Sequence, residues 1–349
     1  MRKLSEVRKV QRFGKSTLMV SLPAEWVKEM GLKPGDLVKI TVRSNGTLVI
    51  SPQRSHKLRE ESVVEILISS KTSDELLRRA IYTSYITGHD KIVIKSVDSN
   101  LTPDQVQGVR SMVRALIGAE IVEQDLSRIV VQVFVDTARY NIQSLVARMI
   151  NIIKSMVNYL NAALRDLNTS LFRELLELEF ELDRVYTLAV RYTYVLSSQR
   201  DGEAGEEAQL LTEYRALIKS LEDVGDTLSS IAKLVNDNDT LKRFAEHLRE
   251  PIAEISDLIN YALDVMMTSM NSRNILLANK SVDITAELAS YFSKLEYSVV
   301  KRVGMEEYPR IRSMLERIRL ACNYLQGSAE MIFDIVVASK GGKIDLTIK

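Results

Sequence analysis

Two pairs of carboxylate side chains, each spaced four residues apart, are the residues of this chain with the clearest capacity for chemistry. Glu179 and Asp183 form one pair, and Glu222 and Asp226 form the other. Residues four apart on a helix share a face, so antiparallel packing of two such helices could bring all four carboxylates together. Like charges at this spacing destabilise a helix by roughly 0.2–0.5 kcal/mol per pair. A bound cation would offset that cost; the alternative is four ordinary solvated carboxylates.

Any metal held here would have oxygen ligands. The chain has one cysteine, Cys322, and three scattered histidines, His56, His89 and His247. A single cysteine excludes an intramolecular disulfide and a cysteine-based metal site. Carboxylate oxygens suit a hard cation such as magnesium, and iron or zinc can also use them.

Long helices must position these carboxylates, and we expect helices from about residue 138 onward. Two heptad seams run through the carboxylate pairs. The first comprises Leu171, Leu175, Leu178, Leu182, Val185, Ala189, Tyr192 and Leu196, and the second Leu210, Tyr214, Leu217, Leu221, Val224, Leu228, Ile231 and Val235. Glycine at position 225, inside the second seam, lowers the stability of the helix by about 1 kcal/mol relative to alanine. Close approach of a neighbouring helix or an ion would explain it.

The rest of the helical region has clear breaks. We expect a loop at 199–207 and a turn at 236–239, followed by helices at about 240–271, 281–302 and 306–338. The polar segment 341–349 is expected to form a tail with a short strand.

The chain lacks the sequence motifs that are typical of several functional classes. No apolar run reaches the roughly 18 residues that a membrane span requires. No Ser/His/Asp signature, P-loop or GxGxxG motif follows a predicted strand. A carboxylate-bridged di-iron enzyme would need Glu-x-x-His pairs on its helices, and the helical region has none. We therefore do not expect an enzyme.

The N-terminal segment differs in character from the helical region. Residues 1–58 contain twelve basic and four acidic residues, a net charge of +8, whereas the remainder of the chain carries −7. Short strands are predicted at 6–13, 17–22, 37–42 and 47–51, with a short helix, AEWVKEM, after Pro23. Asn45-Gly46 is a strong hairpin signal. A basic module of this kind indicates contact with nucleic acid or another anion.

The run GKSTLMVSLPAEWVKEMGLKPGDLVKI resembles the AbrB/SpoVT swapped-hairpin domain. Leu-Pro at 22–23 and Leu-Lys-Pro-Gly-Asp at 32–36 match its pattern in order and spacing. The resemblance implies that two copies interlace into one β-barrel, so residues 1–56 would form a homodimer. It also implies DNA binding through the first hairpin, at positions Arg8, Lys9, Arg12 and Lys15. Other members of the family only assemble, so a pure dimerisation module is the alternative.

A small α/β domain is expected between these two regions, at 62–136. Strands at 63–68, 91–97, 120–124 and 128–135 alternate with two helices in the order β-α-β-α-β-β, which favours a sheet with one helical layer. Capping boxes are predicted at Thr72–Glu75 and at Thr102–Gln105. No site is evident, so we expect a structural or dimerisation role, with a small-ligand sensor as the alternative.

The helical region resembles the PhoU family over about 138–338. The run YRALIKSLEDVGDTLSSIAKLV contains the PhoU mark Leu-Glu-x-(Ile/Val)-Gly-Asp at 221–226, and ELEFELDRVYTLAVR carries the preceding Glu-x-x-x-Asp. The resemblance implies tandem three-helix bundles, here about 137–237 and 239–338 within a body that spans 137–340. It also implies metal binding by Glu179, Asp183, Glu222 and Asp226, and regulation of phosphate uptake in the cytoplasm.

The second half departs from the PhoU pattern. Leu315-Glu316-Arg317-Ile318 repeats the start of the motif, but Leu320 stands where an aspartate is expected. Ala289 and Ser293 occupy the places of Glu179 and Asp183. We therefore expect one metal site per chain, in the first repeat.

Together these features predict a phosphate uptake regulator, mainly α with an α+β N-terminal part, similar to archaeal PhoU-like regulators with an AbrB-type domain. It would act as a transcriptional regulator or as a negative regulator of phosphate transport. The alternative function is a scaffold that dimerises without binding DNA and docks on a phosphate transporter ATPase or a sensor kinase.

Overall fold

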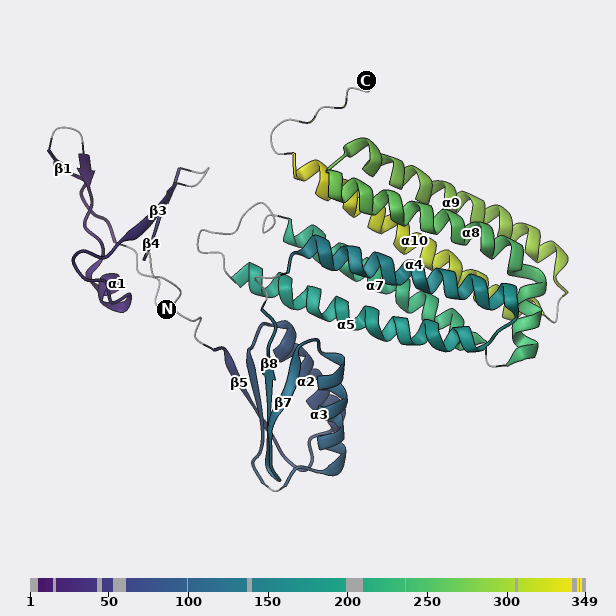
Figure 1. The fold of residues 1–349 in the computed structure, drawn as a ribbon, viewed down its shortest axis with the longest axis horizontal. Coiled ribbons are helices and arrows are strands. Elements are labelled where there is room, and N and C mark those ends of the chain that lie inside the picture. The colour runs from purple at the N-terminus through teal and green to yellow at the C-terminus, as the bar shows by residue number, and fades with distance from the viewer. Residues whose placement is uncertain are drawn as a thin grey trace. The chain divides into compact units, whose positions relative to one another are not determined.

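The computed structural model describes residues 6–14, 17–42, 46–52, 61–98, 100–136, 140–198, 210–235, 237–304 and 307–340, together with residues 344 and 346. The described residues up to Pro52 form one compact unit, and those from Glu61 onward form a second (Figure 1). The described residues do not include Lys15 and Ser16 of the turn predicted at 14–16, the loop predicted at 199–207, or most of the tail.

The N-terminal unit consists of two separate antiparallel hairpins and one short helix. Strands β1 (Gln11–Phe13) and β2 (Thr17–Met19) form one hairpin, and β3 (Val38–Val42) and β4 (Leu48–Pro52) form the other. Helix α1 (Ala24–Glu29) lies between them in sequence. β1 and β2 are shorter than predicted, because the chain pairs them only over three positions.

The connection after α1 follows the predicted turn chemistry. Gly31 adopts a φ of 58°, and the amides of Gly31 and Leu32 donate to the carbonyls of Lys28 and Val27 at 3.1 and 3.0 Å. These two bonds satisfy the free carbonyls at the helix end. Asp36 then closes the next turn, since its amide donates to the Lys33 carbonyl and its carboxylate accepts from the Lys33 amide.

One face of the β3–β4 hairpin is apolar, and three of its side chains are exposed among the residues that the structure describes. The register pairs Ile40 with Ile50 and Val42 with Leu48, so these side chains share a face. Ile40, Val42 and Leu48 are 59%, 71% and 63% exposed. A two-stranded hairpin is at best marginally stable alone in water, so this face requires a partner.

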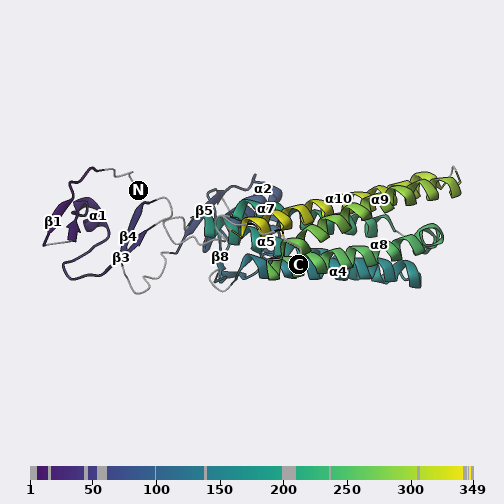
Figure 2. The same cartoon turned by 90° about the horizontal axis from the view of Figure 1, so that it is seen from above.

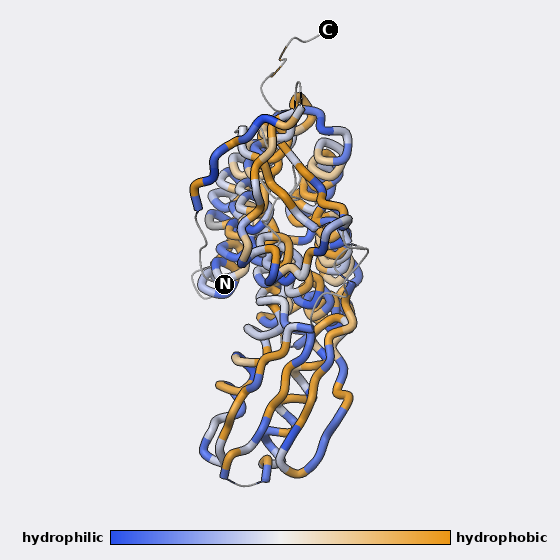
Figure 3. Tube along the Cα trace, turned by 90° about the vertical axis from the view of Figure 1, so that its left-hand side faces the viewer, coloured by the Kyte–Doolittle hydropathy of each residue, from blue (hydrophilic) through white to orange (hydrophobic). Residues whose placement is uncertain are grey.

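The second unit begins with a four-stranded mixed sheet. Its elements follow the predicted β-α-β-α-β-β order: β5 (Val63–Ile68), α2 (Asp74–Ile86), β6 (Lys91–Ser96), α3 (Pro103–Ala115), β7 (Ala119–Gln124) and β8 (Arg128–Val133). The strand order is β5-β6-β8-β7, with β5 and β6 parallel and the other pairs antiparallel. Both helices pack on one face of the sheet, where Ile81, Ile92 and Ile129 are fully buried. Figure 3 shows long apolar stretches along these strands.

One of the two predicted capping boxes is present. Thr102 and Gln105 form a complete box at the start of α3. The box predicted at Thr72–Glu75 is wrong, because Ser73 is the N-cap of α2 and accepts a bond from the Leu76 amide. The Thr72 hydroxyl instead accepts from the Ser69 amide at 3.1 Å, which closes the preceding turn.

Six long helices follow: α4 (Ile142–Asp166), α5 (Ser170–Ser198), α7 (Leu211–Leu234), α8 (Asn238–Ser272), α9 (Ile275–Arg302) and α10 (Tyr308–Ala338). Figure 2 shows them running side by side along a common direction. α4, α5 and α7 pack together, as do α8, α9 and α10, and the two sets join where α4 lies along α8 and α7 along α10. One continuous apolar core fills both sets. α9 begins six residues before the predicted start, because Asn274 caps it by accepting from the Leu277 amide.

A buried arginine ties α5 to the α/β domain. Arg191 is 1% exposed, and its guanidinium donates to the carbonyls of Tyr85 at 2.6 Å and His89 at 2.9 Å. It also lies 5.0 Å from the centroid of the Tyr85 ring and 3.4 Å from the carboxylate of Asp90. The Tyr85 carbonyl lies in the last turn of α2 and the His89 carbonyl just after it, at the negative C-terminal end of the helix, where a cation is favoured. The middle domain and the helices therefore belong to one compact unit.

Candidate metal centre

The packing of α5 against α7 brings three of the four predicted carboxylates together. One carboxylate oxygen from each of Asp183, Glu222 and Asp226 lies within 4.8 Å of the others. Glu179 lies beside this group and bonds to the far end of α7: its Oε1 accepts from Ser229 Oγ at 3.3 Å and is 3.6 Å from Lys233 Nζ. The two helices run antiparallel, since Glu179 meets residues that come after Asp226 while Asp183 meets Glu222.

Gly225 allows the two helices to approach this closely. A Cβ atom at position 225 would fall well inside the contact distance of Leu182 Cδ2 and 3.8 Å from Met156 Sδ. Leu182 is fully buried and has little room to move. The glycine therefore sits where α5 crosses α7, one residue before Asp226 and one residue from the position of Asp183 on the facing helix.

Replacing this glycine is expected to loosen the carboxylate cluster. In Gly225→Ala the new methyl group forces Leu182 and α5 outward, which costs about 1–3 kcal/mol against a gain of about 1 kcal/mol in helix propensity. We expect a lower melting temperature and weaker metal binding. Gly327→Ala in α10 is the matched control, because its Cβ would meet only Ser220 Oγ, at an ordinary 3.8 Å. Equal melting temperatures and metal affinities for the two variants would contradict this role of Gly225.

Without a bound cation, the negative charges of the clustered carboxylates are unfavourable, because the groups are partly buried and repel one another. Burial, followed by the charges of Glu179, Asp226 and Glu222, raises the pKa of Asp183 to about 7. Burial is also the main cause that raises the pKa of Glu222 and of Asp226. Asp183 Oδ1 is buried and has no hydrogen-bond partner among the described residues. A buried acceptor without a partner, among other carboxylates, is the environment that a metal ion would satisfy.

Two lysines on α7 partly neutralise the cluster, and the sequence analysis missed both. Lys219 Nζ bonds to the carboxylates of Glu222 and Asp223, the latter at 2.6 Å. Lys233 lies near Glu179. Their spacing carries the signal that could have found them, since Lys219 precedes Glu222 by three residues and Lys233 follows Ser229 by four.

The raised pKa of Asp183 predicts a specific pH dependence of stability. Its folded-state pKa of about 7 lies above the ordinary value of 3.8, so ionised Asp183 destabilises the metal-free folded protein above pH 7. That destabilisation is relieved as pH falls from 7 towards 3.8. We expect the melting temperature of chelator-treated Asp183→Asn to vary less over this range than that of the native protein. Calorimetry at several pH values measures both, and identical pH profiles would contradict the assignment.

At the positions that correspond to the four carboxylates, the second repeat has other side chains and other contacts. Glu316 accepts a bond from Arg312 Nε at 2.8 Å, and Leu320 is 43% exposed. Ser293 Oγ donates to the Ala289 carbonyl within its own helix. Among the described residues, the cluster on α5 and α7 is the one group of three potential metal ligands.

The residues predicted to contact DNA are exposed where the structure describes them. Arg8 and Lys9 precede β1, and Arg12 lies in β1 opposite Leu18. Arg8 pairs with the exposed carboxylate of Glu6. Lys15 lies outside the described residues.

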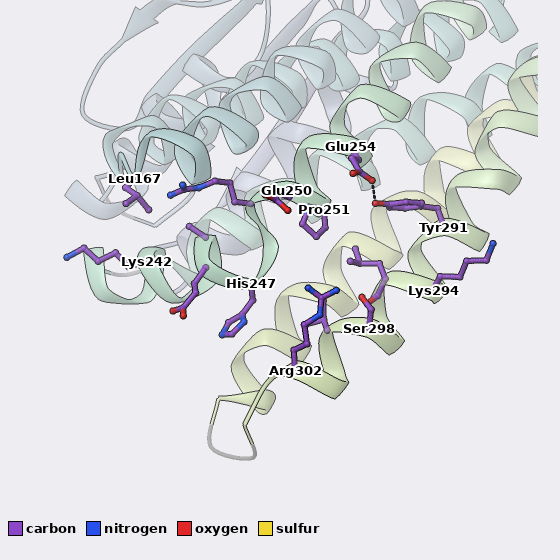
Figure 4. A pocket seen from close by; sticks show the side chains of 15 residues that line it. Leu167, Lys242, His247, Glu250, Pro251, Glu254, Tyr291, Lys294, Ser298 and Arg302 are labelled. Carbon is purple, nitrogen blue, oxygen red and sulfur yellow. Dashed lines mark hydrogen bonds between the residues drawn. The ribbon is translucent and has the colours of Figure 1, made fainter.

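A separate cleft lies between α8 and α9, in the second repeat (Figure 4). Its volume is about 730 Å³, and its charged lining mixes both signs: Lys242, Arg249, Lys294 and Arg302 with Glu246, Glu250 and Glu254. Tyr291 donates to Glu254 across it. Pro251 lies within α8, and a proline inside a helix is a sequence signal for a kink beside this cleft.

Similarity to known proteins follows the same division of the chain. Residues 11–58 match the family described as antidote-toxin recognition MazE, bacterial antitoxin, and residues 146–235 match the PhoU domain family. The chain thus combines a MazE/AbrB-type N-terminal domain with a PhoU domain, which confirms both resemblances. The crystal structure of PhoU from Pseudomonas aeruginosa is similar over 58% of this chain and 96% of that chain, at 15% identity and a TM-score of 0.44. No curated protein matches the chain significantly. No described helix is long and apolar enough to cross a membrane.

Proposed function

We propose that this protein is a phosphate-responsive regulator of the PhoU type that binds a metal in its helical body and DNA through its N-terminal domain. The observation that carries the proposal is the convergence of Asp183, Glu222 and Asp226 within the PhoU-matched region. Glu179 adjoins them and would complete the ligand set by releasing Lys233. A bound metal would supply positive charge that links α5 to α7, so the packing of the bundle would depend on occupancy.

The DNA-binding part of the proposal rests on the N-terminal unit. Its MazE-type match and its excess of basic residues support contact with a nucleic acid. Exposed basic side chains on the first hairpin would meet the phosphate backbone, which gives affinity without sequence preference. A second copy of the chain would double this surface.

Removing two of these charges is expected to weaken DNA binding uniformly. The double variant Arg12→Ala, Lys15→Ala should lower affinity for all sequences and make the salt dependence shallower by about 0.9 for each phosphate that the protein no longer neutralises. Lys95→Ala with Arg110→Ala removes two exposed charges from the α/β domain and serves as the control. Fluorescence anisotropy with labelled duplexes at several salt concentrations measures both slopes. Unchanged binding by the first variant would place the DNA-binding surface elsewhere.

The whole proposal is tested by a gel shift with the full-length protein and the DNA upstream of its own operon. We expect retention at low salt that changes when inorganic phosphate is added, and that also changes after metal is removed with a chelator. A dimer that fails to retain DNA even at low salt would favour the scaffold that docks on a transporter ATPase or a sensor kinase. The uncovered apolar face of β3–β4 suits either function, because both need the dimer.

A further inference from the structure

A groove between α5 and α7 begins where the carboxylate cluster ends. Its volume is about 710 Å³, and the described side chains that line it include Tyr186, Thr193, Tyr194, Thr212, Arg215 and Lys219. Lys219 belongs to both places, since it lines the groove and bonds to Glu222 of the cluster. The groove and the cluster are therefore neighbours on the same two helices.

The charged side chains that line this groove, among the residues the structure describes, are both cations. They are Arg215 and Lys219, and no described carboxylate lines it. The cleft between α8 and α9 differs, because its lining includes the carboxylates of Glu246, Glu250 and Glu254 as well as cations (Figure 4). A groove lined by cations and hydroxyl groups is complementary to an anion with several oxygen atoms.

Arg215 has an unsatisfied donor beside the groove. Its terminal guanidinium nitrogen Nη1 is buried and has no hydrogen-bond partner among the described residues, which also offer Arg215 no carboxylate in an ion pair. The guanidinium lies 5.8 Å from the centroid of the Tyr186 ring, within the range of a cation–π contact. A buried charged donor without a partner is costly, and an oxyanion in the groove would satisfy it. The planar fork of an arginine matches a phosphate in particular.

Lys219 connects this groove to the metal site. In the structure its ammonium bonds to Glu222 and Asp223. A metal ion on Glu222 would repel the ammonium and compete for the same carboxylate, which would release Lys219 towards the groove. By linkage, an anion held by Lys219 would in turn favour metal binding.

We propose that this groove binds a phosphate group through Arg215 and Lys219, and that metal on the adjacent carboxylates strengthens this binding. The proposal deepens the proposed function and rests on it for the metal; the anion site itself rests on the groove. Free inorganic phosphate and the phosphoryl group of a larger metabolite share the required chemistry. The hydroxyl groups of Tyr194 and Thr212 would add donors at the exposed side of the groove.

The test is equilibrium dialysis of the full-length protein with radiolabelled inorganic phosphate, before and after loading with one equivalent of Zn²⁺. A parallel arm uses a nucleoside monophosphate. We expect metal loading to tighten binding by about fivefold or more. Arg215→Gln should weaken it by about tenfold or more, and Arg215→Lys should recover part of the loss. Binding of inorganic phosphate identifies the free ion, and binding of only the nucleotide identifies a phosphoryl group on a larger ligand; either supports the site.

Arg302→Gln is the matched control, because Arg302 lines the other cleft. Metal content and DNA retention are measured on the same preparations, so loss of the anion site is distinguishable from failure of the regulator function. If phosphate binding requires Arg215 but the protein does not bind DNA, the anion site stands and the proposed regulator function is contradicted. Failure of both probes to bind, or equal weakening in Arg215→Gln and Arg302→Gln, would overturn the anion site. Equal affinity with and without Zn²⁺ would overturn the link through Lys219.

Discussion

The full-length protein is expected to behave as a dimer or a larger assembly at micromolar concentration in multi-angle light scattering. The physical reason is the apolar face of the β3–β4 hairpin, where Ile40, Val42 and Leu48 are largely exposed. A single module of this size buries too little apolar surface to be secure. A second copy that interlaces its hairpins with the first would cover the face.

A charge placed on that face should break the assembly. Ile40→Asp is expected to give a monomer with an unfolded N-terminal unit, while the helical unit keeps its circular dichroism signal. Lys39→Asp is the control, because Lys39 precedes Ile40 in the same strand and points to the opposite face. A monomeric native protein would rule out the interlaced barrel, and an intact dimer in Ile40→Asp would place the interface elsewhere.

Native protein is expected to contain one metal site or cluster per chain, and Asp226→Asn is expected to lose most of that metal. The variant keeps the side-chain shape but removes one of the three converging carboxylate charges. Metal at about one hundred times its dissociation constant would stabilise the folded state by about 2.7 kcal/mol. For a chain of this size, that corresponds to roughly 4 °C in melting temperature.

The control for this change lies in the second repeat. Glu316→Gln removes the carboxylate of α10 at the position that corresponds to Glu222, where Glu316 pairs with Arg312. It should alter neither the metal content nor the melting increment. Elemental analysis and calorimetry of the three proteins, each with and without chelator, provide the comparison. Equal metal loss in both variants, or no metal in the native protein, would leave the carboxylates as an ordinary acidic surface.

The sequence predicted the positions of the helices well because their apolar periodicity is long. The seam positions Leu175, Leu182 and Val185 are all fully buried. Gly225 was expected to mark the close approach of a helix or an ion, since a glycine inside a helix needs a compensating reason. The structure shows the close approach of a helix, through Leu182 of α5. The end of α1 and the turn before β3 were also predictable, because Gly31 and Gly35 adopt the positive φ values that favour glycine.

Other features depended on tertiary contacts that a single sequence does not encode locally. Thr72 and Ser73 are both good capping residues, and only the preceding turn decides which of them caps α2. Glu179 and Asp183 share a helix face, but Ser229 and Lys233 on the facing helix hold Glu179 to one side. Arg191 has no distinguishing local pattern, because its partners are about one hundred residues away.

The measurement that tests the metal centre most directly is anomalous X-ray scattering from crystals of native protein, collected above and below the absorption edges of iron and zinc. The arrangement of α5 and α7 predicts an anomalous peak among the carboxylates of Asp183, Glu222 and Asp226, with none beside Glu316 and Leu320. A protein with Lys219 still bonded to Glu222 and no peak at this position, in crystals grown with Zn²⁺ present, would contradict the assignment.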